Sequence, residues 1–135
     1  MTEIKFRAWI HDAPQRRRKE AMFYQNNQYL SSFINRIYSK YLCNHPSQMP
    51  FQLEERLMQY TGLKDYNGKE IYKGDILKHP NSDEKFVVKW VDHYCGFRAV
   101  YNNFDLSLSN QVNEKGRATI IGNIFQNPEL LEVEE

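Results

Sequence analysis

Turn signals recur at short intervals through the second half of the chain, and they limit what this sequence can fold into. They lie at Asn67-Gly68, Lys73-Gly74, 80–83, Cys95-Gly96, Asn102-Asn103 and Lys115-Gly116. The apolar segments between them have the spacing of short strands in all-β barrels and sandwiches. The sequence therefore predicts strands at residues 70–72, 75–78, 85–91, 97–101 and 117–125.

The 85–91 segment shows the strongest alternation. Phe86, Val88 and Trp90 form one apolar row, whereas Val87, Lys89 and Val91 form a mixed one. Side chains two residues apart share a face of a strand. The pattern favours a curved antiparallel sheet that closes on itself.

The first quarter of the chain also has strand periodicity. Ile4, Phe6 and Ala8 alternate with polar or aromatic residues, which predicts a strand over 3–9. A basic loop over 11–19 and a second short strand over 21–24 follow.

The period then changes to that of a helix. The apolar residues are Leu30, Phe33, Ile34, Ile37, Tyr38 and Tyr41, and they fit one 3.6-residue stripe. With Asn27 as N-cap and Pro46 as a stop, we expect a helix over 28–42. This apolar stripe would face either the core of the monomer or the interface of a dimer. Residues 51–57 fit either a short helix or an extended segment.

Length and composition predict one domain. The 135 residues are 41% hydrophobic and carry a formal net charge of +1, which favours neither a DNA-coating protein nor an acidic mimic. We expect an α+β domain, mainly β, over 1–135, with a strand, basic loop and helix in 1–56, a small curved β-barrel in 57–126 and a turn in 127–135. No apolar run could span a bilayer, so we expect a cytoplasmic protein without a membrane partner, with reduced cysteines.

Three segments together resemble one known family. They are Ile4-Lys5-Phe6-Arg7-Ala8-Trp9; residues 58–65 with 67–72 and Gly74-Asp75-Ile76; and residues 121–125 with 127–131. In order and spacing they are similar to the YopX family, small proteins of bacteriophages and prophages of Gram-positive bacteria. Residues 10–55 depart from the family pattern, with Ile10 where an Asp is expected.

The resemblance implies a phage origin, the cytoplasm of a bacterial host and a compact fold rich in β structure. The family has no established activity, so it supplies no site residues. The residues of the middle block have a structural explanation of their own. Gly62 and Gly74 suit positive φ in turns over 61–65 and 73–74, and Asp75 suits capping of backbone N–H groups.

Few residues suggest catalysis or metal binding. Cys43 with His45 and His93 with Cys95 offer four ligand types that zinc accepts, but their one-residue gaps strain a shared tetrahedral site. His93 and Cys95 are also poorly spaced for a catalytic pair, because they would lie two residues apart on one strand. Scattered carboxylates leave a metal-dependent enzyme as an alternative. We expect no catalytic residue and no cofactor.

Nucleic-acid binding is a better-supported alternative. Residues 1–40 hold eight Lys and Arg against three Asp and Glu. A basic loop and an aromatic, cationic β surface could together bind a single strand. The residues concerned are Arg16, Arg17, Arg18, Lys19, Lys85, Lys89, Trp90, Phe97 and Arg98.

The favoured interpretation is a non-catalytic binding module. An aromatic-rich β surface, or the helix over 28–42, would dock on a host or phage protein or on a second copy of the chain.

Overall fold

The computed structural model describes residues 4–10, 21–25, 29, 32–34, 36–37 and 56–131. The chain divides into two compact units. Lys5–Gln59 form the N-terminal unit, and Met1–Ile4 with Tyr60–Glu135 form the C-terminal unit. Each has a core of its own. Within the described residues, no helix is long and apolar enough to cross a membrane.

Strand β1 is central in the N-terminal unit. β1 (Phe6–Ile10) pairs antiparallel with β2 (Ala21–Tyr24) on one side and with the start of β3 (Leu57–Lys64) on the other. Residues 32–34 and 36–37 are helical, as the apolar stripe predicted. Phe33 and Ile37 pack with Ala8, and all three are fully buried. These two stripe residues therefore belong to the monomer core; the rest of the 28–42 helix lies outside the described residues.

Strand β3 runs from one unit into the other. Its first residues pair with β1, and Tyr60 and Lys64 pair with β4 (Glu70–Tyr72). Between those two pairs the register shifts, and Gly62 adopts a φ of +88° there. Residues 61–64, for which the sequence predicted a turn, therefore belong to a strand that contains a bulge. The predicted positive φ of Gly62 is confirmed.

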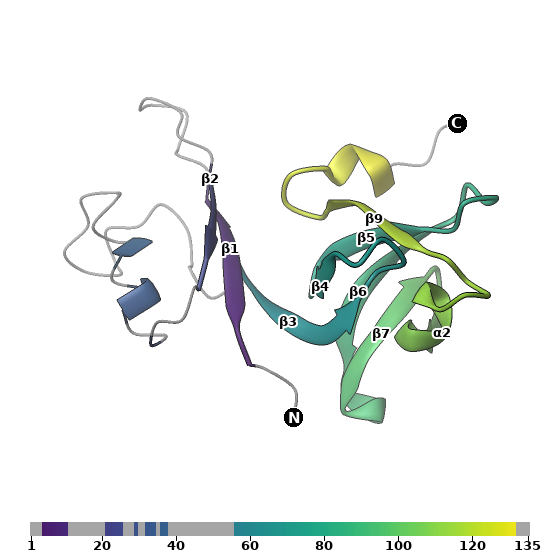
Figure 1. Ribbon diagram of the computed structural model, residues 1–135, viewed down its shortest axis with the longest axis horizontal. Helices are drawn as coiled ribbons and strands as arrows, with labels where there is room; N and C mark the ends of the chain where they lie inside the picture. Colours follow the sequence, from purple (N-terminus) through teal and green to yellow (C-terminus); the bar gives the residue numbers. More distant parts are fainter. Residues whose placement is uncertain are drawn as a thin grey trace. The chain divides into compact units, whose positions relative to one another are not determined.

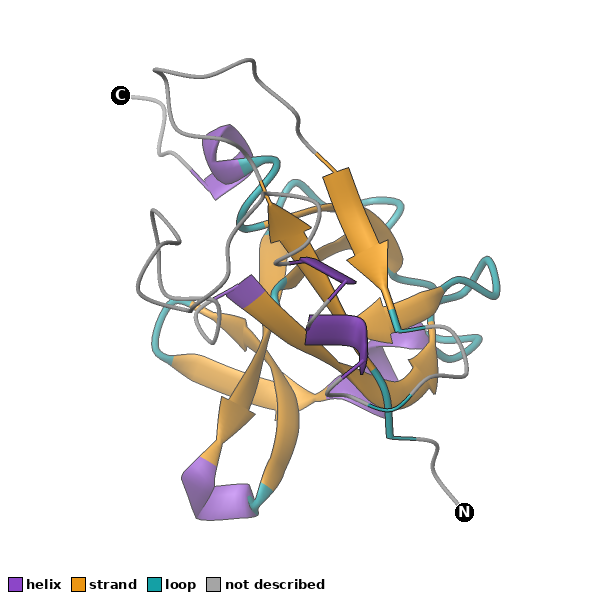
Figure 2. Cartoon of the chain, turned by 90° about the vertical axis from the view of Figure 1, so that its left-hand side faces the viewer, coloured by secondary structure: helices purple, strands orange, loops and turns teal. Residues whose placement is uncertain are grey.

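The C-terminal unit holds a five-stranded antiparallel sheet with the order β8-β7-β6-β5-β9. Its strands curve, as Figures 1 and 2 show. The predicted class, α+β and mainly β with a curved antiparallel sheet, is confirmed. The bounds are β5 (Asp75–Lys78), β6 (Lys85–Val91), β7 (Gly96–Tyr101), β8 (Phe104–Ser107) and β9 (Thr119–Asn123).

Alternate residues of this sheet fill the core, as the period-2 pattern predicted. Phe86 and Val88 of β6 pack with Leu77, Ala99 and Ile71. Trp90 continues the same row, yet its side chain is 46% exposed, because it lies at the strand end beyond the core cluster. The apolar row thus has a buried part and an exposed part.

Two elements after β7 did not follow from the turn pattern. β8 and α2 (Leu108–Val112) occupy a segment for which the sequence predicted no element. β9 is shorter than the predicted 117–125 strand, since Arg117 has a φ of +58° and positive φ is incompatible with a strand. The short 3₁₀ helices η3 (Asp92–Tyr94) and η4 (Pro128–Leu131) complete the unit, and η4 lies within the segment 127–135 where the sequence predicted a turn.

Candidate binding surface

The end of the β6–β7 hairpin carries a fixed pair of aromatic rings. Trp90 and Phe97 face each other across the two strands. Their ring centroids are 5.2 Å apart at an interplanar angle of 80°, the edge-to-face geometry that aromatic pairs prefer. Trp90 Nε1 donates a hydrogen bond to Asp92 Oδ1 at 2.8 Å. The exposed indole is therefore held in one orientation.

A second ring lies at the same hairpin end, on η3. The Arg98 guanidinium carbon is 4.0 Å from the centroid of the Tyr94 ring, well within cation–π range. Tyr94 is 52% exposed. We call Trp90, Tyr94, Phe97 and Arg98, with Asp92, the hairpin tip.

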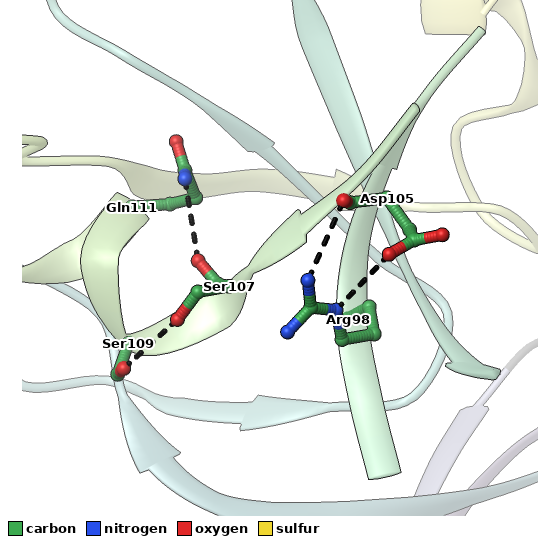
Figure 3. A network of polar contacts seen from close by, with 5 residues as sticks. All are labelled: Arg98, Asp105, Ser107, Ser109 and Gln111. Carbon is green, nitrogen blue, oxygen red and sulfur yellow. Dashed lines mark hydrogen bonds and ion pairs between the residues drawn. The ribbon is translucent and has the colours of Figure 1, made fainter. Parts of the chain in front are cut away.

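Arg98 also contacts the neighbouring strand. Its Nε lies 3.3 Å from Asp105 Oδ1, and its Nη2 donates to the Asp105 carbonyl oxygen at 3.5 Å, as Figure 3 shows. An internal carboxylate thus compensates its charge. Arg98 presents a positioned guanidinium, and its contribution to a cationic surface is reduced.

The sequence grouped Trp90 and Phe97 with nearby cations in one surface, but the structure places the two rings on the face opposite those cations. Consecutive residues of a strand point to opposite faces of the sheet. Lys89 therefore faces away from Trp90, and Arg98 faces away from Phe97, while Lys85 shares the Lys89 face. The two parts of the predicted nucleic-acid surface do not meet on one face. Arg16, Arg17, Arg18 and Lys19 lie outside the described residues, so their role stays a prediction.

An open groove lies beside the two lysines. It has a volume of about 730 Å³. Val87, Val100 and Tyr101 of the sheet line it together with Leu130 and Leu131 of η4. Lys85 and Lys89 border it, but so do Asp83 and Glu84. The groove is therefore part apolar and mixed in charge.

The four candidate zinc ligands are only half described. His93 and Cys95 lie at the hairpin tip, where Cys95 is exposed and its Sγ contacts the Asp92 carbonyl oxygen at 3.4 Å. Cys43 and His45 are outside the described residues. In the part of the chain that the structure describes, no three His, Cys, Asp or Glu side chains form a group that could hold a metal ion.

Exposed apolar residues at the edge of the same sheet were missed from sequence. Phe104 and Leu106 of β8 are 66% and 36% exposed. They alternate with Asp105 and Ser107, and this period-2 pattern is the signal that could have revealed β8. Tyr94 was also missed, because its exposure depends on the 3₁₀ turn.

Comparisons with known proteins agree with this architecture. A crystal structure of protein EF1440 from Enterococcus faecalis is similar to the chain, with a TM-score of 0.55 and 26% sequence identity, over 98% of this chain and 100% of that one. No curated protein matches the sequence. The family model described as YopX protein matches residues 5–132, nearly the whole chain. The chain therefore belongs to the YopX family.

Proposed function

We propose that this protein is a non-catalytic binding module that acts on a protein partner in a bacterial host cell. The hairpin tip would carry the contact. In this proposal the chain is an accessory protein of a phage or prophage and works in the cytoplasm. Membership of the YopX family and similarity to an Enterococcus faecalis protein support the bacterial setting.

The exposed and positioned aromatic residues of the tip carry the proposal. Trp, Tyr and Arg are the residues that most often dominate binding energy at protein interfaces. Here Trp90 and Tyr94 are about half exposed, and Asp92 and Arg98 hold them in place. A partner would meet rings that are already ordered, so little side-chain entropy would be lost on binding.

The separation of Trp90 and Phe97 from the cations favours a protein over a nucleic acid. Single-strand binding combines stacked bases with a basic groove along the backbone. On β6 and β7, Trp90 and Phe97 lie on one face and the cations on the other, and Arg98 is paired with Asp105. A protein surface makes no such demand on the arrangement of charge.

A capture experiment tests the proposal. Immobilised protein is incubated with lysate of a Gram-positive bacterium, and retained proteins are identified by mass spectrometry. We expect a specific protein to be retained by the wild type and lost with Trp90→Ala. Tyr66→Ala is the matched control, because Tyr66 is 48% exposed against 46% for Trp90 but lies in the turn after β3. Equal retention by wild type and Trp90→Ala would contradict the proposal.

The groove beside Lys85 and Lys89 supports nucleic-acid binding as the second candidate function. Both lysines border one surface, where they could contact phosphates. Anisotropy of labelled single-stranded DNA, duplex DNA and RNA would be measured across a salt series. Binding through about two phosphates would give a slope of log affinity against log salt of roughly −1.4 for single strands. Its loss in a Lys85→Ala/Lys89→Ala variant would favour this candidate over the first.

A further inference from the structure

Among the residues that the structure describes, strand β8 leaves one edge of the five-stranded sheet open. Within this part of the chain it pairs with β7 alone, across the two-residue turn Asn102-Asn103. The residues flanking such a turn, Tyr101 and Phe104, form a hydrogen-bonded pair. Farther along the two strands, non-hydrogen-bonded and hydrogen-bonded pairs alternate. The backbone N–H and carbonyl of Leu106 therefore bond to β7, whereas the backbone groups of Asp105 and Ser107 point away from β7.

The other side of the sheet gives the same alternation. The Val88 carbonyl oxygen accepts a hydrogen bond from Gly74 N at 2.8 Å, on the β5 side of β6. Ala99, which is opposite Val88, must then direct its own backbone groups toward β8, where its partner is Leu106. Two independent observations thus assign the outward positions to Asp105 and Ser107.

The outward groups of β8 are only half used. The Asp105 carbonyl oxygen accepts from Arg98 Nη2, and the Ser107 carbonyl oxygen accepts from Gln111 Nε2 at 3.2 Å (Figure 3). Each carbonyl has a second lone pair. The N–H groups of Asp105 and Ser107 have no acceptor among the residues that the structure describes. Two open donors at alternate positions are the pattern to which another strand adds.

The opposite edge of the sheet is covered. Ile120 N of β9 donates to Asp65 Oδ2 at 2.9 Å, and the Ala118 carbonyl oxygen accepts from Tyr66 N at 3.1 Å. The turn after β3 therefore occupies the outer side of β9. This contrast makes β8 the edge at which the sheet can be extended.

We propose that a second copy of this chain pairs with β8, antiparallel and about a two-fold axis through Leu106. The register follows from the outward positions. Asp105 is then opposite the partner's Ser107, so that the two strands exchange four backbone hydrogen bonds, and a carboxylate meets a hydroxyl and not another carboxylate. Leu106 is opposite the partner's Leu106, and this pair covers two side chains that are 36% exposed in the single chain. The edge is self-complementary in hydrogen bonding and apolar contact.

Disulfide trapping tests the register. In a Cys43→Ser/Cys95→Ser background, Leu106→Cys places two thiols on a directly opposed, non-hydrogen-bonded pair. Such a pair has a Cα separation of about 4.5 Å, within the range of a disulfide. Phe104→Cys is the control, since the register sets its two copies about 14 Å apart although Phe104 is the more exposed residue. We expect a covalent dimer on oxidation with Leu106→Cys and not with Phe104→Cys.

Sedimentation velocity over a wide concentration range tests the association without a covalent bond. We expect the wild type to shift from monomer toward dimer as its concentration rises, and Leu106→Lys to lose that shift. Ile121→Lys is the matched control, because Ile121 is also 36% exposed but lies on the covered edge strand β9. A wild type that remains monomeric throughout, or equal trapping of the two cysteine variants, would overturn the dimer. Neither result bears on the hairpin tip, whose lysate experiment is separate.

Discussion

At the scale of single residues, two buried carboxylates organise turns of the C-terminal unit. Asp65 Oδ1 accepts from the backbone N–H groups of Asn67 and Lys69, and its Oδ2 accepts from Ile120. Asp75 Oδ2 accepts from Tyr72 N at 2.8 Å. Both residues are more than nine-tenths buried. They act as backbone acceptors, which is the structural role that the sequence assigned to Asp75.

Replacing Asp65 with Ala should lower the free energy of unfolding. Three backbone donors lose their acceptor, and an unmet buried donor costs about 1–3 kcal/mol. Because the turn can relax toward water, we expect a total loss of about 2–4 kcal/mol in urea unfolding. Asp83→Ala is the control, since Asp83 is exposed and should change stability by less than about 0.5 kcal/mol. Similar losses in both variants would contradict this role.

Gly74 should not tolerate a side chain. Its φ is +91°, and its N–H and carbonyl bond to Val88 and to Ile124. A β-carbon at positive φ costs roughly 1–2 kcal/mol, so Gly74→Ala should lower the melting temperature. The comparison is Gly96→Ala, where φ is not positive and an added Cβ would meet only Tyr94 O at 3.6 Å. An unchanged melting temperature for Gly74→Ala would refute the argument.

At the scale of elements, the contacts of His79 connect the α2 segment to the sheet. It follows β5, and its Nδ1 donates to the Gly116 carbonyl oxygen at 2.6 Å. Its Nε2 lies 2.8 Å from Gln111 Oε1 on α2, and its ring meets Phe86 edge to face. α2 has only five residues, too few for an isolated helix to be stable in water. Tertiary contacts of this kind must therefore hold it.

We expect His79→Ala to loosen residues 108–118 without unfolding the sheet. The loss of the hydrogen bond from Nδ1, at about 1 kcal/mol, and of the edge-to-face contact with Phe86, at about 0.5–1.5 kcal/mol, should speed local amide exchange at least about tenfold. Hydrogen–deuterium exchange by mass spectrometry would show the change in this segment, with the β6 amides unchanged. Lys115→Ala, in the same loop, should leave exchange as in the wild type. A uniform increase in amide exchange over all strands would show that His79 stabilises the whole sheet and not the 108–118 segment alone.

At the scale of the whole molecule, two cores are connected by one strand. Ala8, Phe33 and Ile37 form the core of the N-terminal unit, and the five-stranded sheet has a separate one. β3 begins in the first unit and ends in the second. The hydrogen bonds of β3 depend on both β1 and β4. We therefore expect the two units to unfold cooperatively, as the single domain predicted from the sequence would.

The two tryptophans report on the two units separately. Trp9 is on β1 and Trp90 is on β6. Trp90→Phe leaves a probe in the N-terminal unit, and Trp9→Phe leaves one in the C-terminal unit. Fluorescence in urea should give coincident transitions for both probes once each variant's own change in stability is measured by circular dichroism. Two separate midpoints would show two independent domains.

Sequence periodicity predicted most of the strands with accurate bounds. β2, β4, β5 and β6 lie where the alternation and the turn residues placed them. Local signals are sufficient there because each strand is bounded by residues such as Gly74 or Asn67-Gly68 that favour a turn. The candidate site was predicted only in part. Trp90 and Phe97 do pair at one hairpin end, but Lys89 and Arg98 were grouped with rings from which the strands turn them away.

What the sequence determined by itself is the set of local conformations and the faces of each strand. These depend on neighbouring residues, which one chain segment carries with it. Only the tertiary structure decided that Trp90 lies beyond the core, that Asp65 covers the edge of β9 and that no other described strand pairs with the edge of β8. Those features depend on contacts between segments as far apart as Asp65 and Ile120. No local pattern specifies them, because they form only when segments distant in the sequence come together.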